Sequence, residues 1–209
     1  MRCPIHREGW IFSSGCFLAA FLARTISRRL SRFMAFLGAF TLYFFRDPER
    51  EIPSGAQIIV SPADGHVIGI DQVDYAPFIE GPAKRISIFL SIFDVHINRA
   101  PIEGTVGYRH YHPGKFFPAN IDKASLDNEQ NAIGIEDAGF KVLVKQIAGI
   151  VARRIVCWVD NGSKLARGDR FGLIRFGSRT ELYMPLSAKI EVQIGQKVQG
   201  GATIVGRRS

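Results

Sequence analysis

The chain has 209 residues, enough for one ordinary domain with an appendage and too few for two large domains. Its hydrophobic content of 46%, with 16 Phe, indicates a packed core and excludes a disordered chain. The net charge of +8 indicates an anionic partner, and composition alone allows nucleic acid, an anionic membrane or a phosphorylated substrate.

The distribution of the positive charge favours the membrane. Much of the excess is arginine in the first fifty residues, where it alternates with apolar runs. Aromatic RNA-binding strands, zinc fingers and basic helices with heptads are absent from the sequence, so we expect no nucleic-acid partner. The three cysteines, Cys3, Cys16 and Cys157, have no metal-site spacing, which predicts no bound metal and a reducing compartment.

Two apolar runs at residues 11–23 and 33–45 flank the basic segment RTISRRLSR. Each run of 13 residues would span about 20 Å as a helix, short of the roughly 30 Å hydrocarbon core. We therefore expect residues 1–50 to form an apolar helical hairpin that lies in one leaflet. A cleaved signal peptide is the alternative, which the second apolar run disfavours because it would serve no purpose after cleavage.

Residues 51–209 carry the pattern of a mostly β protein. IIVSPADGHVIGI predicts a strand, a tight turn and a strand, and RISIFLSIF predicts a buried strand. FKVLVKQIAGIVARRIVCWV predicts two strands with a kink near Gly149, and FGLIRF, ELYMP, AKIEVQI and ATIVG predict further short strands. Short strands separated by Gly-containing turns are typical of a β-sandwich or barrel.

The two ends of this β region resemble the flattened barrel of biotinyl and lipoyl carrier domains. The resemblance lies in AKIEVQIGQKVQGGATIVG at the C-terminus and in SPADGHVIG near residue 61. The lysine that those carriers modify is absent from the tip position, so we expect no carried biotin or lipoate.

The dipeptide Gly177-Ser178 lies between two predicted strands, at a turn. A strained Gly-Ser peptide allows the serine hydroxyl to attack the preceding carbonyl, because glycine imposes no side-chain barrier to the distorted backbone. A plain β-turn is the alternative. The other such pair, Gly162-Ser163, lies in a polar VDNGSK segment that predicts a hairpin loop.

Other candidate residues are Asp64 in a Pro-x-Asp-Gly turn and His96 after a buried strand, and either could be purely structural. Residues 112–131 show little periodicity and predict a long loop, which in a compact domain is functional or disordered. We interpret His112, Phe116 and Asn131 in this segment as substrate-binding residues.

Six motifs in chain order are similar to those of the short-form phosphatidylserine decarboxylases, a resemblance that covers residues 44–209. They are FFRDPER, SPADGHV, FDVHINRAPIEGTV, YHPGKFFPAN, SLDNEQN and RFGSRTELYMP. The resemblance implies a proenzyme that cuts itself between Gly177 and Ser178 into chains 1–177 and 178–209. It also implies that residues 51–209 are the catalytic domain.

The same resemblance implies a pyruvoyl cofactor made from Ser178. This ketone would form a Schiff base with the amine of phosphatidylserine and accept the electrons released as carbon dioxide departs, yielding phosphatidylethanolamine. Longer relatives use an Asp and a His as a base relay for cleavage, and the Asp corresponds to Asp64. The longer forms carry two histidines in this segment, where the present chain has His96 and Arg99. His96 is thus expected to serve either cleavage or decarboxylation.

Two alternatives stay open at this point. One is a decarboxylase of a related seryl phospholipid, such as archaetidylserine, because the head-group chemistry would be the same. The other is a membrane-anchored β-barrel binding module without catalysis. Under the leading interpretation the protein is peripheral or monotopic at the cytoplasmic face of the cell membrane, on an anionic surface. The sequence leaves a homo-oligomer open.

Overall fold

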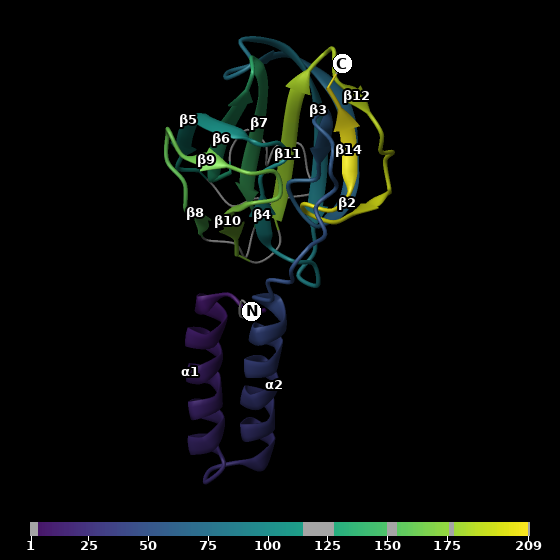
Figure 1. Cartoon of the computed structure of the whole chain (residues 1–209). Coiled ribbons are helices and arrows are strands. Elements are labelled where there is room, and N and C mark those ends of the chain that lie inside the picture. The colour runs from purple at the N-terminus through teal and green to yellow at the C-terminus, as the bar shows by residue number, and fades with distance from the viewer. Residues whose placement is uncertain (1–3, 115–127, 150–153, 176–177, 209) are drawn as a thin grey trace. The chain divides into compact units, whose positions relative to one another are not determined.

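The computed structural model describes residues 4–114, 128–149, 154–175 and 178–208. The chain divides into two compact units, Met1–Glu49 and Arg50–Ser209. The first unit is helical, and the described part of the second unit contains strands and no helix (Figure 1).

The helical unit is a pair of helices, α1 (Arg7–Ala23) and α2 (Arg28–Phe44). Each helix has 17 residues and is longer than the predicted apolar run. In α2 the extra residues include the arginines of the first turn, ahead of which Ser27 caps the helix. The helices pack closely where Gly38 leaves room for the Phe17 ring. Within the described residues, no helix combines the length and apolarity that crossing a bilayer requires.

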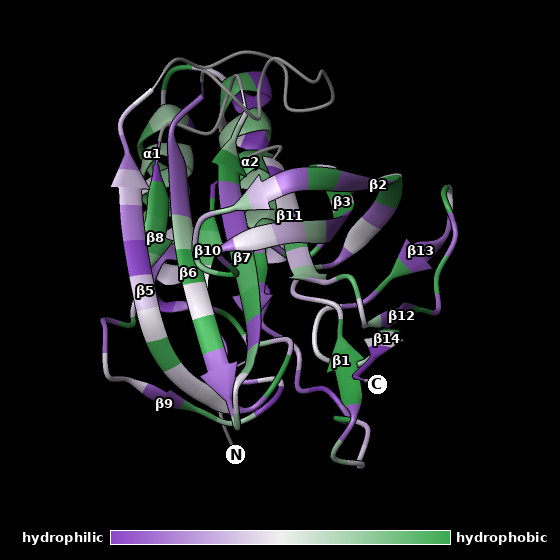
Figure 2. Cartoon of the chain, turned by 90° about the horizontal axis from the view of Figure 1, so that it is seen from above, coloured by the Kyte–Doolittle hydropathy of each residue, from purple (hydrophilic) through white to green (hydrophobic). Residues whose placement is uncertain are grey.

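The main element of the second unit is an eight-stranded antiparallel sheet, in the order β13-β2-β3-β11-β7-β6-β5-β9. Its strands are β2 (Gly65–Ala76), β3 (Gly81–Leu90), β5 (Gly104–His112), β6 (Gln130–Asp137), β7 (Phe140–Ala148), β9 (Lys164–Leu165), β11 (Ser178–Pro185) and β13 (Lys197–Val198). The sheet coils strongly, so that β2 and β3 run across the view of Figure 2 while β5, β6 and β7 run along it. The predicted mostly β class is confirmed, and the sheet is an open, curled half-barrel.

Two three-stranded sheets complete the unit, in the orders β1-β14-β12 and β4-β10-β8. Their strands are β1 (Ile58–Val60), β4 (Ile97–Arg99), β8 (Ile155–Cys157), β10 (Arg170–Ile174), β12 (Lys189–Ile190) and β14 (Ile204–Arg207). The main hydrophobic core joins these sheets to one face of the large sheet, which we call the core face. Leu182 and Met184 of β11 point into this core, together with Ile86 and Ile88 of β3.

The other face of the large sheet, which we call the inner face, has a smaller apolar cluster that includes Leu143, Tyr183 and Phe78. Phe78 belongs to the β2–β3 hairpin and reaches across to β6, where Gly134 has no side chain to obstruct the ring. Alternate residues of each strand therefore meet different surroundings, as the two-residue period of a strand requires.

The strands form two repeats of seven with the same pairing pattern. In chain order, β1, β2, β3, β11, β12, β13 and β14 correspond to β4, β5, β6, β7, β8, β9 and β10. Each repeat contributes four strands to the large sheet and one complete three-stranded sheet. The equivalent strands β11 and β7 pair with each other at the centre.

Equivalent turns open the two repeats. The sequences PADGHV at residues 62–67 and PIEGTV at 101–106 place Gly65 and Gly104 at φ of +148° and +152°. A Cβ atom at either glycine would collide with a partner-strand carbonyl, that of Phe89 or of Glu136. Glycine is therefore required twice, for the same reason, at equivalent positions.

The second repeat is inserted into the first, between β3 and β11. Asp137 pairs with Phe140 across the tight turn between β6 and β7, and Leu90 pairs with Ser178 at the equivalent place between β3 and β11. Ser178 is thus the residue at which the chain returns from the inserted repeat to the interrupted one.

The sequence prediction was incomplete around residues 104–131. Strand β5 was not predicted, because its side chains are mostly exposed or half-buried and its sequence lacks apolar alternation. The predicted loop at 112–131 was too long, since His112 lies in β5 and Asn131 lies in β6. Phe116 lies outside the described residues.

Candidate functional site

Five of the predicted site residues lie at one end of the strands of the large sheet or beside it. They are Asp64, His96, His112, Asn131 and Ser178. Strands β2 and β11 both pair antiparallel with β3, so their first residues lie at the edge where β3 ends. The end of β7, the start of β6 and the end of β5 follow along the same edge, because those strands also alternate in direction. We call this row of strand ends the Ser178 edge; it runs across the strands and is not an outer strand of the sheet.

Ser178 is the first residue of β11 and is fully buried. It lies opposite Leu90 on one side and Ala148 on the other. Its Oγ is also buried and, among the residues that the structure describes, has no hydrogen-bond partner. A buried hydroxyl without a partner costs about 1–3 kcal/mol, which makes this position unusual for serine. Gly177 lies outside the described residues.

His96 lies beside the end of β10. That strand ends at Ile174, four residues before Ser178. The His96 carbonyl accepts a hydrogen bond from Ile174 N at 3.2 Å, and Ile174 packs in one cluster with Ala148, the cross-strand neighbour of Ser178. The imidazole is almost fully buried, and its Nδ1 lies 3.0 Å from the Asp94 carbonyl. If Nδ1 donates to that carbonyl, Nε2 is left as the basic nitrogen.

The internal repeat of the strands also predicts that His96 lies near Ser178. His96 directly precedes β4 and corresponds to Gln57, which directly precedes β1, just as Ser178 corresponds to Phe140. Gln57 and Phe140 line a single cavity at the opposite edge of the sheet. The equivalent residues His96 and Ser178 are thus expected to face a common space.

Asp64 lies in the turn that precedes β2. Its two carboxylate oxygens accept hydrogen bonds from Arg50 Nη2 at 2.7 Å and from Gly200 N at 2.8 Å. The arginine fixes the carboxylate as an ionised acceptor. Because β3 separates β2 from β11, the backbones of Asp64 and Ser178 are two strand spacings apart, about 10 Å.

A chain of buried amides connects the turn of Asp64 to the strand of Ser178. Asn98 Nδ2 lies 3.1 Å from Thr180 Oγ1 and 3.4 Å from the Pro62 carbonyl. Gln146 Nε2 donates to Asn98 Oδ1 at 2.8 Å, and Asn131 Nδ2 donates to Gln146 Oε1 at 2.8 Å. These side chains are on the core face, on which Thr180 and Ser178 also lie, because the two residues are two positions apart in β11.

The two predicted substrate-binding residues that the structure describes, His112 and Asn131, lie on opposite faces of the sheet. Asn131 belongs to the amide chain on the core face and is 1% exposed. His112 is on the inner face, where it lines a cavity with Gln130 and Lys145. Arg99, at the position of the second histidine of the longer forms, is buried and donates to the Gly168 carbonyl at 3.0 Å.

Sequence reasoning did not assign roles to Asn98, Gln146, Thr180 or Asn128. Asn128 donates to the carbonyl of Ala148 at 2.7 Å and so fixes the end of β7 beside Ser178. Asn98 and Asn128 lie within the motifs FDVHINRAPIEGTV and SLDNEQN, so motif membership was an available signal. Gln146 gave the weaker signal of a polar residue in the middle of an apolar strand.

The fold and this edge define a class of protein. The serine is excluded from water at the centre of a sheet, with a buried imidazole beside the preceding strand and a fixed carboxylate two strands away. A hydrolase needs a serine that an external substrate can reach, whereas the Ser178 hydroxyl is buried. The arrangement suits a protein that modifies itself.

The comparisons with known proteins agree with this class. Residues 37–206 match the family model described as phosphatidylserine decarboxylase. The chain is 47% identical to the phosphatidylserine decarboxylase proenzyme of Symbiobacterium thermophilum, over 99% of this chain and 97% of that protein. It is 46% identical to the proenzyme of Carboxydothermus hydrogenoformans, over 99% of each, and 45% identical to that of Nitrosomonas europaea, over 96% and 94%. The chain belongs to the phosphatidylserine decarboxylase family.

The amide chain leads to a test of how the Ser178 strand is positioned. Thr180→Val keeps the shape of the side chain and removes the oxygen that pairs with Asn98, which should lower the free energy of unfolding by about 1–3 kcal/mol. If the chain cuts itself at Ser178, as we propose below, this cleavage should also slow on a denaturing gel, because the Thr180 hydrogen bond to Asn98 would position β11. The matched control is Thr203→Val, which loses an exposed bond to Gln199 N and should cleave normally. Equal cleavage rates in both variants would contradict a positioning role for the amide chain.

Proposed function

We propose that this protein decarboxylates phosphatidylserine to phosphatidylethanolamine, with a pyruvoyl group that it makes from Ser178. Family membership and the name shared by its relatives support the reaction and the substrate. The observation that carries the assignment of Ser178 is its buried Oγ, without a partner among the described residues, at the first position of the central strand.

Self-cleavage would begin with attack of Ser178 Oγ on the carbonyl carbon of Gly177. The peptide nitrogen leaves that carbon and takes up a proton, which gives an ester and a free amine on residue 178. Loss of the Cα proton then expels the Gly177 carboxylate and leaves dehydroalanine. Water hydrolyses the imine tautomer of this residue, which releases ammonia and leaves the pyruvoyl group at the start of β11.

The residues of the edge would assist as follows. We propose that His96 takes the Ser178 hydroxyl proton or returns a proton to the substrate carbon, a role supported by its buried ring and by its backbone hydrogen bond to Ile174 at the end of β10. Asp64 would stabilise the charge that develops on the base, and Arg50 and Gly200 hold its carboxylate in one orientation. We assign no role to Arg99, whose guanidinium donates to the Gly168 carbonyl.

The pyruvoyl group, once formed, supplies an electron sink for the bond that loses carbon dioxide. The position at the start of β11 fits such a group, because the neighbouring strands β3 and β7 hold β11 from both sides. β11 pairs with β3 over its whole length and with β7 from Ser178 to Tyr183. The chain 178–209 should therefore stay bound to the chain 1–177 after cleavage.

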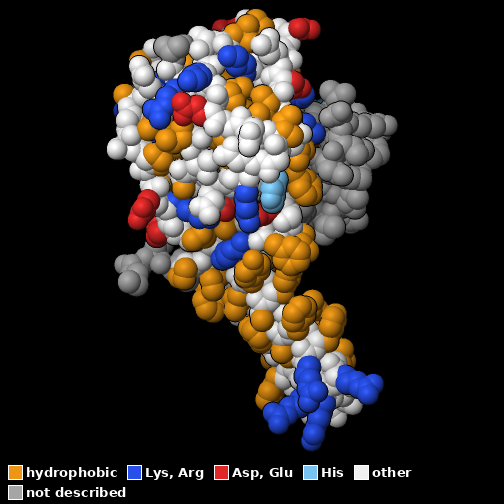
Figure 3. Space-filling model, turned by 90° about the vertical axis from the view of Figure 1, so that its right-hand side faces the viewer, with side chains coloured by type: hydrophobic (Ala, Val, Ile, Leu, Met, Phe, Trp, Pro, Cys, Tyr) orange, Lys and Arg blue, Asp and Glu red, His pale blue; other side chains and the backbone are white. Residues whose placement is uncertain are grey.

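We propose that the helical unit attaches the protein to the cytoplasmic face of the cell membrane. Large apolar side chains are exposed along both helices, and Figure 3 shows them around the helical pair with arginines gathered at one end. The exposed apolar residues include Phe12, Leu18, Phe21, Leu22, Leu30, Phe33 and Phe36. Arg24, Arg28 and Arg32 line a hollow with Ser31 near the turn, where each cation would contribute on the order of 1 kcal/mol at an anionic leaflet.

Ser178→Ala tests the proposed origin of the active group. The variant should run as a single uncut chain on a denaturing gel and release no carbon dioxide from phosphatidylserine, because the attacking oxygen is gone. Ser163→Ala is the matched control, since Ser163 follows the other Gly-Ser junction and lies in a turn with Asp160. Two chains from Ser178→Ala, with the same boundary, would show that another residue performs the cleavage.

Substitutions of Asp64 and of His96 should affect different steps, cleavage and decarboxylation. Asp64→Ala should block or greatly slow cleavage, whereas His96→Ala should still cleave and lose decarboxylation. The assay scores chain cleavage and carbon dioxide release separately. His66→Ala and Asp74→Ala serve as controls, because both side chains are exposed. A variant with normal rates in both steps would remove that residue from the mechanism.

Membrane attachment has two separable components. The protein should sediment with vesicles that contain phosphatidylserine, and high salt should weaken the association without abolishing it, because apolar insertion adds to the charge attraction. Deletion of residues 1–45 should release most of the protein while cleavage persists. Complete release by salt alone would contradict insertion of the apolar side chains.

A further inference from the structure

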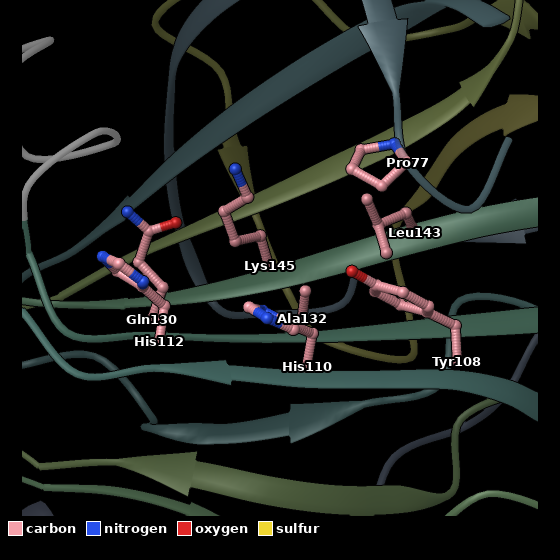
Figure 4. A pocket seen from close by; sticks show the side chains of 8 residues that line it. All are labelled: Pro77, Tyr108, His110, His112, Gln130, Ala132, Leu143 and Lys145. Atoms are coloured by element: carbon pink, nitrogen blue, oxygen red, sulfur yellow. The ribbon is translucent and has the colours of Figure 1, made fainter. Parts of the chain in front are cut away.

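The inner face of the large sheet contains a cavity of about 300 Å³ (Figure 4). Three neighbouring strands provide most of its lining, and the β2–β3 hairpin adds Pro77. The lining residues are Pro77, Tyr108, His110, His112, Gln130, Ala132, Leu143 and Lys145. None of these side chains takes part in the proposed cleavage.

The cavity extends to the Ser178 edge. His112 pairs with Gln130 at the end of the sheet, Gln130 pairs with Ile147, and Ile147 pairs with Arg179, the residue after Ser178. Lys145 lies three residues before Ala148, which is opposite Ser178. At about 3.3 Å per residue, the Lys145 backbone is about 10 Å from that edge.

The same face has a buried cluster of charges beside the cavity. Glu181 is fully buried and contacts Arg179 at 2.9 Å, Arg85 at 3.7 Å and the Tyr183 hydroxyl at 2.5 Å. Burial and the neighbouring Glu181 raise the pKa of Tyr183 well above its usual value, so Tyr183 stays a neutral donor to that carboxylate. The oxygens of Glu181 are therefore already engaged by other groups.

Lys145 is the cation of this cluster that has no ion-pair partner among the described residues. It lies opposite Glu181 in the strand register, but among the described residues its side chain contacts the Tyr183 ring and forms no ion pair. Arg85 divides its charge between Glu181 and Asp71, the second carboxylate of the cluster. Counted over the described residues, three cations face two carboxylates. Burial lowers the pKa of Lys145, which reflects the cost of keeping this cation out of water without an anion of its own.

We propose that this cavity binds the phosphate of the phospholipid head group, with Lys145 as the cation that neutralises it. The assignment rests on the proposed function and specifies where the substrate is held. His110, His112 and Gln130 provide hydrogen-bond donors, while Pro77, Ala132 and Leu143 form an apolar wall beside the glycerol carbons. A cavity at the lower end of the roughly 300–1,000 Å³ range accepts a head group and leaves the acyl chains outside.

The position agrees with the reaction. The Ser178 side chain is on the core face, but the carbon that the serine amine must reach is the former Cα of Ser178, which lies in the sheet at the start of β11. The amine can therefore reach it at the end of the sheet while the phosphate lies farther along the inner face. The Lys145 backbone is about 10 Å from the edge, a distance that the lysine side chain and the head group would have to span together. Lys145 would hold the head group in the ground state and the transition state alike, and so its removal should affect KM more than kcat.

Lys145→Met tests the assignment in the full-length, membrane-competent protein. Binding of soluble glycerophosphoserine, measured by calorimetry, should weaken about tenfold to a hundredfold, and KM for phosphatidylserine should rise similarly with little change in kcat. Lys145→Arg should retain most of the binding. The control is Lys141→Met, which changes a lysine on the same face of the same strand that pairs with Glu80 outside the cavity. Thermal melting verifies that each variant is folded.

The outcomes separate the possible ligands and the two proposals. Equal binding of glycerophosphoserine by wild type and Lys145→Met would overturn the assignment. Inorganic phosphate binding as tightly as glycerophosphoserine would overturn the head-group assignment in favour of a site for free phosphate. Lys145-dependent binding in a preparation that releases no carbon dioxide would support the cavity and contradict the proposed function.

Discussion

The pairing of β11 with strands on both sides is the constraint on which the rest of the site depends. Ser178 starts this strand, opposite Leu90 of β3 and Ala148 of β7, and is withdrawn from water by both neighbours. An exposed serine in a loop would be hydrated and free to rotate. Central pairing instead fixes the backbone from Ser178 onward, in a position where its hydroxyl is buried, and the same pairing would hold the chain 178–209 in place after the proposed cleavage.

The proposed cleavage junction coincides with the point at which one repeat is inserted into the other. In the inserted repeat a tight turn joins β6 to β7, and no chemistry is needed there. In the interrupted repeat the equivalent connection contains a whole seven-stranded unit, so the proposed cut would not open a tight hairpin. The insertion also brings Asn98, from the start of the inserted repeat, beside β11, and His96 beside the end of β10. Sequence separation and spatial separation are therefore unrelated at this site.

The part of the site that could be predicted from the sequence is the part that local chemistry determines. The Pro-x-Asp-Gly turn of Asp64 requires glycine at positive φ, and the motif carries that information within a few residues. The amide chain could not be predicted, because Gln146 and Asn98 are 48 positions apart and Asn98 and Thr180 are 82 apart. Strand β5 was missed because a half-exposed strand lacks the apolar alternation on which strand prediction relies. The inner face was missed for a similar reason, since a sequence pattern predicts charged residues at the surface, whereas Glu181 is fully buried and Lys145 half-buried.

The mass of the C-terminal chain of the wild-type protein tests the origin of the active group most directly. A chain of residues 178–209 that begins with a pyruvoyl group is lighter than the same peptide with an N-terminal serine by one ammonia. It resists Edman degradation, and borohydride reduction in the presence of phosphatidylserine should attach the lipid amine to its first residue. A C-terminal chain with the full mass of a serine peptide, in a preparation that releases carbon dioxide, would contradict the assignment of Ser178.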